Sequence, residues 1–250
     1  MLLKSNELFA GDTLAQTSPL ETRVILVRHG ESNFNAQGRH QGSSDESVLT
    51  EIGRIAASQT GIFLNEISFD AVYTSSLKRA RETTSEILKV MNLDIKVHST
   101  PALREIDLQG WQGLLHREVQ EKFPEEYRCW KESPHEFRMA IPQTEVLGGG
   151  VATVTQQQYC FPVLDLCDRA QQFWHKILPH HAGQTLLIVS HSGTIRALIA
   201  TAMGLSPARY HALQQSNCGV SILNFPDSCH QMAQLEAMNL TTHLGETLPK

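Results

Sequence analysis

The sequence predicts an α/β fold, a three-layer sandwich in which helices cover both faces of a mostly parallel central sheet. Two apolar runs, Val24–Val27 and Leu186–Val189, contain only branched aliphatic residues, which is typical of strands buried on both faces. Segments with helical spacing of apolar residues alternate with such strands along the chain. A βαβ order of this kind places successive strands parallel, with helices on both sides of the sheet.

Length and charge limit the domain organisation and the partners. The 250 residues are enough for one α/β domain, which we place at residues 22–246. Residues 1–21 lack a long apolar run and an Arg-rich amphipathic pattern, so we expect a short N-terminal extension. The net charge is -5 without long runs of one sign, and no segment reaches membrane-spanning length. We therefore expect no nucleic-acid partner and no membrane partner.

The five cysteines are an odd number and lack the tight spacing of metal sites. This pattern argues against a disulfide framework and against a zinc site. It favours free thiols in a reducing compartment, and we expect the protein to be cytoplasmic.

The first half of the domain contains two strand-helix units. Thr50 is expected to cap a helix whose core face carries the apolar residues Ile52, Ile55, Ala56, Ile62 and Phe63. Residues 69–74 predict the next strand. Ser75 or Ser76 is expected to cap the helix that follows, with the inward residues Leu77, Ala80, Thr84, Ile87 and Leu88.

The second half begins with a short strand at residues 94–98. An insertion is expected at about 114–160. Within it, residues 115–132 look helical and are expected to form a lid over the site. Residues 139–159 are expected to be a long loop or disordered. Pro162 begins a helix with the inward residues Val163, Leu166, Ala170, Phe173, Trp174 and Ile177. After the strand at 186–189, a further helix follows over 194–203. Residues 220–225 and 232–240 predict two strands added antiparallel to the sheet.

Histidines follow both of the buried apolar runs. Arg28-His29-Gly30 follows the first run, and Ser190-His191-Ser192-Gly193 follows the second. Because the carboxyl ends of parallel strands meet at one edge of the sheet, both histidines are expected in one pocket. A neutral imidazole beside a guanidinium can attack an electrophile whose negative charge the arginine neutralises, and phosphate is such an electrophile. An isolated Arg-His pair would more often be a core histidine beside a surface cation, but this pair is not isolated.

Two further motifs lie between the histidines. Lys78-Arg79-Ala80 stands at the start of a predicted helix, and Leu103-Arg104-Glu105 precedes a polar loop. Together, the four motifs make the chain resemble the histidine phosphatase superfamily, also called the phosphoglycerate-mutase-like family. The resemblance implies the phosphoglycerate-mutase-like fold and turnover through a phosphohistidine.

The resemblance implies a role for each motif residue. His29 would be the nucleophile, and Arg28, Arg79 and His191 would hold the phosphoryl oxygens, with Asn35 as a further donor. Arg81 is the alternative arginine in its helix, but two helical positions turn a side chain by about 200°. The family pattern favours Arg79, and Arg81 is then a surface charge that pairs with nearby acids.

Glu105 would donate a proton to the leaving oxygen and later activate water. Asp107 is the second choice for this acid, and it could instead brace the loop. The expected substrate contacts are Gln41, Gly42 and Ser192, and weaker candidates are Trp111, which could simply pack under its loop, and Gln112. The remaining histidines are expected to be ordinary residues: His40, His98, His116, His135, His175, His180, His181, His211, His230 and His243.

Metal binding is the competing interpretation, because two histidines and a carboxylate can bind zinc or iron. Arg28 and Arg79 would place two permanent positive charges beside such a cation. We therefore predict an anion site with no metal and no cofactor.

The loop after Glu105 favours a phosphatase over a mutase. Phosphoglycerate mutases carry an Arg-His-Tyr-Gly type segment where this chain has residues 106–113. Residues 123–130 are similar to metal-independent phosphoserine phosphatases, although Leu108 replaces a histidine that some of them have. Residues 41–45 and 215–221 are similar to plant 2-carboxyarabinitol 1-phosphate phosphatases.

The resemblance therefore implies a metal-independent phosphatase of a small phosphorylated metabolite, either phosphoserine or a sugar-acid phosphate such as 2-carboxyarabinitol 1-phosphate. The alternatives are a phosphoglycerate mutase and a non-catalytic phosphate-binding regulatory module. The family contains many dimers, so a homodimer is an open expectation.

Overall fold

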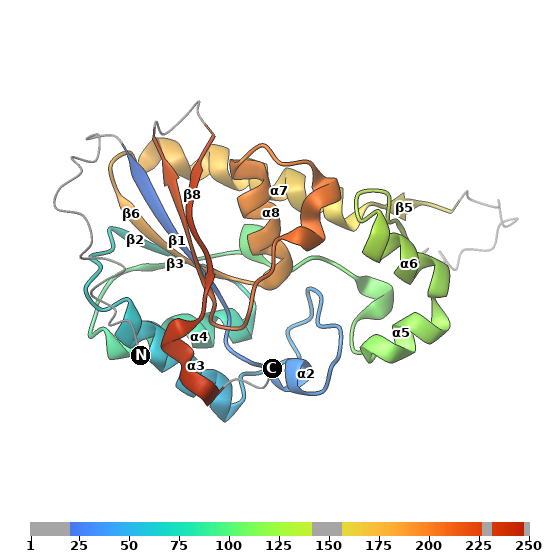
Figure 1. The fold of residues 1–250 in the computed structure, drawn as a ribbon, viewed down its shortest axis with the longest axis horizontal. Helices are drawn as coiled ribbons and strands as arrows, with labels where there is room; N and C mark the ends of the chain where they lie inside the picture. Colours follow the sequence, from blue (N-terminus) through green and yellow to red (C-terminus); the bar gives the residue numbers. More distant parts are fainter. Residues whose placement is uncertain (1–20, 142–156, 227–231, 248–250) are drawn as a thin grey trace, which may run out of the picture.

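The computed structural model describes residues 21–141, 157–226 and 232–247, and its centre is a six-stranded sheet (Figure 1). The strand order is β3-β2-β6-β1-β7-β8. Strands β3, β2, β6 and β1 are parallel, whereas β7 runs antiparallel to both β1 and β8. The strand bounds are β1 Thr22–Arg28, β2 Ala71–Ser75, β3 Val97–Thr100, β6 Thr185–Ser190, β7 Val220–Phe225 and β8 Gln234–Leu240. The two C-terminal strands are thus antiparallel additions, as predicted, and β3 begins three residues later than expected.

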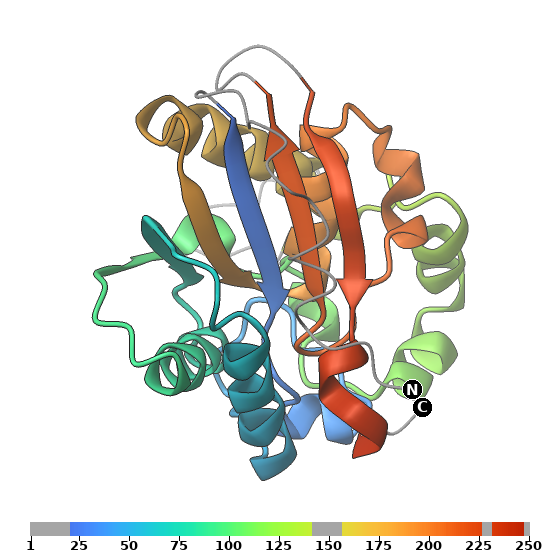
Figure 2. The same cartoon turned by 60° about the vertical axis from the view of Figure 1, so that its left-hand side comes forward.

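Helices cover both faces of this sheet. Helices α7 (Pro162–Ile177) and α8 (Ser192–Ala202) lie on one face, and α3 (Glu51–Phe63) and α4 (Lys78–Val90) lie on the other (Figures 1 and 2). Side chains of β1 alternate between the two cores: Val24 packs with α7 and α8, and Ile25 packs with α3 and α4. Each fully buried aliphatic side chain contributes roughly 1.5–3 kcal/mol. The predicted three-layer α/β sandwich is confirmed.

Helix α3 begins where predicted but buries a different face. The Thr50 hydroxyl accepts a hydrogen bond from Gly53 N at 3.0 Å, so the expected N-cap is present. The expected core face is wrong for its isoleucines, since Ile52, Ile55 and Ile62 are 46%, 48% and 66% exposed. The buried face consists instead of small residues and one phenylalanine: Gly53, Ala56, Ala57, Thr60, Gly61 and Phe63.

Close packing explains this choice of face. A Cβ atom at Gly61 would lie 2.7 Å from the backbone oxygen of Ile87 in α4. The two helices therefore approach through backbone and small side chains, which isoleucines would prevent.

Helix α4 has its predicted core face but not its predicted cap. The residues expected inward are all buried. The N-cap position is Leu77, which has no side-chain cap. The Ser75 hydroxyl accepts a hydrogen bond from Leu77 N at 3.2 Å and also contacts His191, so it serves the sheet edge rather than the helix.

The region from 114 to 160 has more structure than predicted. Helices α5 (His116–Lys122) and α6 (Pro124–Glu132) occur as expected. The prediction of a loop from 139 to 159 is wrong for the two ends of that segment. There, β4 (Met139–Ala140) pairs antiparallel with β5 (Tyr159–Cys160). Residues 142–156 lie outside the described residues.

The short helices are α2 Asn33–Ala36, η1 Pro101–Leu103, η2 Gln109–Trp111, η3 Leu178–His180, η4 Pro207–Ala212 and η5 Thr242–Thr247.

The expected N-terminal extension falls almost wholly outside the described residues, so the domain division stays a prediction. In the part of the chain that the structure describes, no helix combines the length and apolar character needed to cross a bilayer.

Candidate active site

The two motif histidines lie side by side at the carboxyl edge of the sheet. His29 directly follows β1 and His191 directly follows β6, and these strands are neighbours in the sheet. The His29 amide donates to the backbone oxygen of Ser190 at 2.9 Å. The two ring centroids are 5.1 Å apart, and the residues are 2% and 0% exposed. Parallel strand pairing thus brings together residues 162 positions apart in the chain.

The imidazole of His29 is held in one tautomer. Its Nδ1 lies 2.7 Å from the backbone oxygen of Gly30. A carbonyl oxygen can only accept, so Nδ1 carries the proton and Nε2 keeps its lone pair. Burial, followed by the charges of Arg79 and Arg28, lowers the pKa of His29 well below 6.5. A neutral ring with a free Nε2 is the form that can act as a nucleophile.

The loop around His29 is fixed by contacts from three other segments. The Gly30 amide donates to the Thr83 hydroxyl at 3.0 Å, and the Asn217 side-chain amide donates to the His29 oxygen at 2.9 Å. A Cβ atom at Gly30 would lie 2.4 Å from the backbone oxygen of Gly53. Only glycine allows this approach of α3, so the Arg-His-Gly motif needs its third residue for packing.

Arg28 and Arg79 are held by neutral acceptors. Arg28 Nη1 donates to the backbone oxygen of Gln215 at 2.7 Å. Arg79, which is fully buried, donates to the backbone oxygens of Ser44 at 2.8 Å and Gly42 at 2.9 Å. Desolvation lowers the pKa of each guanidinium to about 10, so both stay charged at neutral pH. The contacts orient the two charges without neutralising them.

These groups line a cavity of about 770 Å³, a size that suits a small ligand. Among the described residues that line it, the charged side chains are five cations and one acid: Arg28, Arg39, Arg79, Lys131, Arg196 and Glu105. The protein as a whole carries a net charge of -5. This local excess of positive charge favours an anionic ligand.

The Glu105 carboxylate sits on the N-terminus of α8. Its Oε2 accepts from Gly193 N at 3.0 Å, and its Oε1 accepts from Thr194 N at 3.0 Å. The positive end of the helix dipole favours a carboxylate at this position. A Cβ atom at Gly193 would lie 2.5 Å from Glu105 Oε1 and 2.4 Å from the Tyr210 hydroxyl. Gly193 therefore makes room for the carboxylate.

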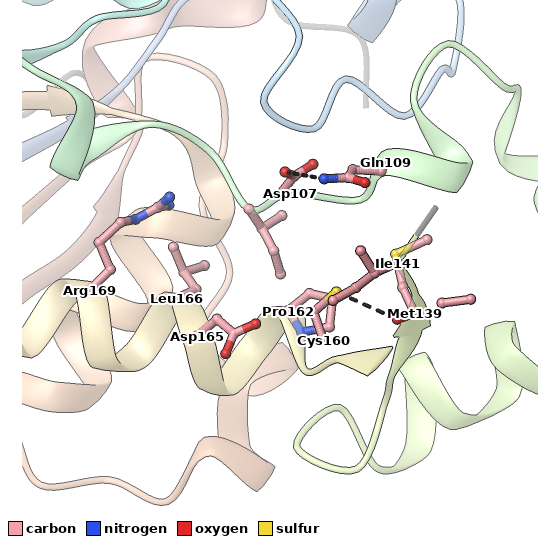
Figure 3. A pocket seen from close by; sticks show the side chains of 11 residues that line it. Asp107, Gln109, Met139, Ile141, Cys160, Pro162, Asp165, Leu166 and Arg169 are labelled. Carbon is pink, nitrogen blue, oxygen red and sulfur yellow. Dashed lines mark hydrogen bonds between the residues drawn. The ribbon is translucent and has the colours of Figure 1, made fainter. Parts of the chain in front are cut away.

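The second-choice acid, Asp107, faces another cavity. Its carboxylate accepts hydrogen bonds from the side-chain amides of Gln109 at 3.2 Å and Gln112 at 3.1 Å. Figure 3 shows Asp107 with Gln109 at a separate cavity of about 210 Å³, which Arg169 also lines. Asp107 is thus placed to brace its loop, the alternative role considered for it.

The expected substrate-contact residues line the cavity of His29. Asn35, Gln41, Gly42 and Ser192 all belong to its wall. The Asn35 Oδ1 accepts from Asn217 Nδ2 at 3.2 Å, and the Gln41 Oε1 accepts from the hydroxyls of Ser32 and Ser47. Because their oxygens are engaged, the amide NH₂ groups of Asn35 and Gln41 are the donors left for a ligand.

His191 lies behind His29 rather than in the cavity wall. Its Nε2 is 2.7 Å from the Ser75 hydroxyl, and its Nδ1 has no hydrogen-bond partner within the described residues. Burial and nearby positive charges, first that of Arg79, lower the pKa of His191 well below 6.5.

The weaker candidates lie elsewhere. Trp111 is buried against Phe137, with ring centroids 4.9 Å apart, so the packing alternative describes it. Gln112 bonds to Asp107. Arg81 is exposed, and no ion pair of its side chain occurs within the described ranges.

Three of the histidines expected to be ordinary lie in the cavity wall. His40, His116 and His211 line the cavity of His29. Burial lowers the pKa of His40 and of His211 to about 4, so both are neutral at pH 7. They come from segments without a strand-histidine pattern, so no motif marked them individually, although His116 belongs to the expected lid.

Arg196 is a further cavity residue that the sequence reasoning missed. Arg196 lies in the helix predicted over 194–203, and it stands four positions after the expected contact Ser192, with which α8 begins. Residues four positions apart share one helix face. Arg39 and Tyr210 are further wall residues that were not predicted, and Tyr127 and Lys131 lie in the wall as part of the expected lid.

Within residues 21–141, 157–226 and 232–247, no group of three or more His, Cys, Asp or Glu side chains could hold a metal ion. The expectation of a metal-free reaction stays a prediction.

Known proteins match most of the chain. The 2-carboxy-D-arabinitol-1-phosphatase of Triticum aestivum is 40% identical over 203 residues, which are 81% of this chain and 37% of that protein. The chain thus spans little more than a third of the length of this plant relative. Phosphoserine phosphatase 1 of Hydrogenobacter thermophilus is 31% identical over 224 residues, which are 90% of this chain and 95% of that protein.

A solved structure and a family model also match most of the chain. Bacillus stearothermophilus YhfR matches with a TM-score of 0.74 and 26% identity, covering 89% of this chain and 99% of that one. This likeness and the sheet order confirm the expected phosphoglycerate-mutase-like fold. The model described as "Histidine phosphatase superfamily (branch 1)" matches residues 24–238. By this match and by its relatives, the chain belongs to branch 1 of the histidine phosphatase superfamily.

Proposed function

We propose that the protein hydrolyses a small phosphomonoester through a phosphohistidine on His29, without a metal ion. The observation that carries the proposal is the Nδ1 contact of His29 with Gly30 at 2.7 Å, which leaves Nε2 unprotonated beside two guanidinium groups. Such an arrangement suits attack on an electrophile with several negative oxygens.

In the first step, His29 Nε2 forms a bond to phosphorus while the ester oxygen leaves on the opposite side. Arg28 and Arg79 hold the remaining phosphoryl oxygens, with Asn35 as a further donor. His191 is proposed as the third holder through Nδ1, its nitrogen without a partner among the described residues, and this requires its ring to turn past His29 toward the cavity. The Glu105 carboxylate first takes up a proton; it then gives this proton to the leaving oxygen, and the alcohol departs. The cavity residues Gln41, Gly42 and Ser192 contact the substrate.

In the second step, water attacks the phosphorus of the phosphohistidine. Glu105 takes a proton from this water, the P–N bond breaks, and His29 returns to its neutral form as inorganic phosphate is released. The donors of the first step stabilise the charge again, because the oxygens occupy the same positions.

The proposed substrate is phosphoserine or a sugar-acid phosphate such as 2-carboxyarabinitol 1-phosphate. The names of the Hydrogenobacter and wheat relatives support these two choices. A cavity of about 770 Å³ has room for either molecule.

We also propose that residues 22–246 work as one domain in a reducing, cytoplasmic environment. Four cysteines within the described residues are free: Cys129, Cys160, Cys167 and Cys218. Helix α6 is proposed as part of a lid, since Tyr127, Trp130 and Lys131 lie in the cavity wall.

The experiment is hydrolysis of a panel of phosphomonoesters by the wild type and by His29→Ala, with and without a chelator. We expect inorganic phosphate from the wild type only, unaffected by chelation. Brief reaction with a ³²P-labelled substrate should label the wild type with an acid-labile phosphoryl group, and His29→Ala should stay unlabelled. Chelator-sensitive hydrolysis would contradict the metal-free reaction.

The same panel tests the two alternatives. Conversion of 3-phosphoglycerate to its isomer, dependent on a bisphosphorylated primer, would identify a mutase. Binding of phosphate without turnover of any substrate would identify a regulatory module.

A further inference from the structure

Among the described residues, Arg196 is one of four arginines in the wall of the His29 cavity, with Arg28, Arg39 and Arg79. It lies one turn after Ser192 on α8, and both residues line the cavity. Side chains on a helix lean toward its N-terminus, which here is the end that meets the sheet edge. The position on α8 therefore directs the Arg196 side chain back toward the site.

Neutral groups hold the Arg196 side chain in place. Its Nη1 lies 3.1 Å from His211 Nδ1, and His211 Nε2 lies 2.7 Å from the backbone oxygen of Trp130. Since that carbonyl oxygen must accept, Nε2 carries the His211 proton and Nδ1 accepts from the arginine. The Arg196 guanidinium carbon is also 5.5 Å from the centre of the Tyr210 ring. His211 and Tyr210 orient the guanidinium, and neither neutralises it.

Some arginines outside this cavity have acidic partners. Arg23 pairs with Glu236 at 2.7 Å, and Arg54 pairs with Glu82 at 3.3 Å. No carboxylate within the described residues forms an ion pair with Arg196. A partly buried charge without a counter-charge is unfavourable, so this site is suited to an anion that comes with the ligand.

Arg28 adjoins His29 in the chain, whereas the guanidinium of Arg196 is held at another part of the cavity wall, against His211 and Tyr210. The charges that lower the pKa of His29 are those of Arg79 and Arg28, whereas the charge of Arg196 acts on Arg28, Tyr210 and His211. Arg79 is anchored to the loop at residues 42–47, and Arg196 is anchored through His211 to α6. A phosphoryl group at His29 would thus use Arg28 and Arg79, and Arg196 would face the rest of the substrate.

We propose that Arg196 binds a carboxylate of the substrate, so that the preferred substrates are phosphorylated acids rather than phosphorylated alcohols or amines. The charges are compatible, because Arg28 and Arg79 offset a phosphoryl dianion and Arg196 offsets a carboxylate, within a wall that carries five cations and one acid. A guanidinium also presents planar donor geometry that fits a carboxylate. This inference rests on the proposed phosphatase activity.

The test compares pairs of substrates that differ in one carboxylate: L-phosphoserine with phosphoethanolamine, and 3-phosphoglycerate with glycerol 3-phosphate. We expect the wild type to favour the acid of each pair. Arg196→Ala should lower kcat/KM for the acids by about 10- to 100-fold, the usual effect of a charge-assisted hydrogen bond. It should leave turnover of the carboxylate-free partners unchanged.

Two further variants complete the test. Arg209→Ala removes an exposed arginine of η4 and should leave all four reactions unchanged. Arg196→Lys keeps the charge but loses the planar donors, so it should restore part of the preference for acids, which a purely structural role would not do. Thermal unfolding of each variant shows that it is folded.

The outcomes separate the two proposals. If the wild type hydrolyses acids and their partners equally, or if Arg196→Ala slows both members of a pair equally, the carboxylate site is wrong and the phosphatase proposal stands. If the wild type hydrolyses none of the four and no other phosphomonoester of the wider panel, the phosphatase proposal fails and the carboxylate site fails with it.

Discussion

Arg169 of α7 donates a hydrogen bond from Nη2 to the backbone oxygen of Glu105 at 3.2 Å. The same Nη2 also bonds to the backbone oxygen of Arg104. The Glu105 side chain is bound by α8, through Gly193 N and Thr194 N. Two helices of one layer therefore hold the candidate acid, one through its backbone and the other through its carboxylate.

Arg169→Ala removes the hydrogen bonds to the backbone oxygens of Arg104 and Glu105, so Glu105 should shift. A shift of about 1 Å in a reacting group should lower kcat by about 10- to 100-fold. The KM should change little, because Arg169 does not line the His29 cavity. Steady-state kinetics on one phosphomonoester measure both constants. Arg169→Lys should recover part of the kcat, and a rise in KM with unchanged kcat would show that Arg169 acts on the substrate instead.

Gly193→Ala should lower kcat/KM by about 100-fold, because its Cβ would displace the Glu105 carboxylate from 2.5 Å away. Gly110→Ala is the matched control. Its Cβ would meet only the flexible end of Met139 at 3.3 Å, so activity should be retained. Equal activity of the two variants would mean that the position of Glu105 is unimportant.

Stability should fall as the pH drops below about 6.5. Burial depresses the pKa of His40, His211 and His243 to about 4 from 6.5, and the pKa values of His29 and His191 are also lowered. The unfolded chain then binds more protons than the folded protein below pH 6.5, so the free energy of unfolding decreases with falling pH in that window. Urea denaturation at pH 7.5, 6 and 5 measures it. The same free energy of unfolding at pH 7.5 and pH 5 would contradict the neutral state of these rings.

Gly61→Ala should destabilise the protein by about 1–3 kcal/mol, because the added methyl would lie 2.7 Å from the backbone oxygen of Ile87. Ile62→Gln, at the neighbouring position, changes a side chain that is 66% exposed and should alter stability by less than about 0.5 kcal/mol. Urea denaturation of both variants compares the two faces of α3. The reverse order would mean that the isoleucines are covered.

Local features of the sequence predicted much of the fold. The runs Val24–Val27 and Leu186–Val189 are strands buried on both faces, and Thr50 caps α3. Apolar spacing also identified the inward face of α7. The strand-histidine motifs brought His29 and His191 to one sheet edge, because parallel pairing of adjacent strands determines where their ends lie.

Other features depended on contacts between distant segments. Spacing alone favoured the isoleucine face of α3, and the close approach of α4 selected the small-residue face instead. His40, His116 and His211 carry no motif, and they reach the cavity because the loop after α2, the start of α5 and η4 come together around it. Their roles could not be predicted from neighbouring residues.

The sequence by itself determined the α/β class and the residues that stand at the strand ends. Both depend on hydrophobic periodicity and on the order of strands and helices along the chain, which can be read from consecutive residues. Only the tertiary structure decided which nitrogen of His29 is free, which arginines lack an acidic partner and what surrounds Arg196. Those properties depend on hydrogen bonds and charges between residues far apart in the chain, and they arise only when the layers pack.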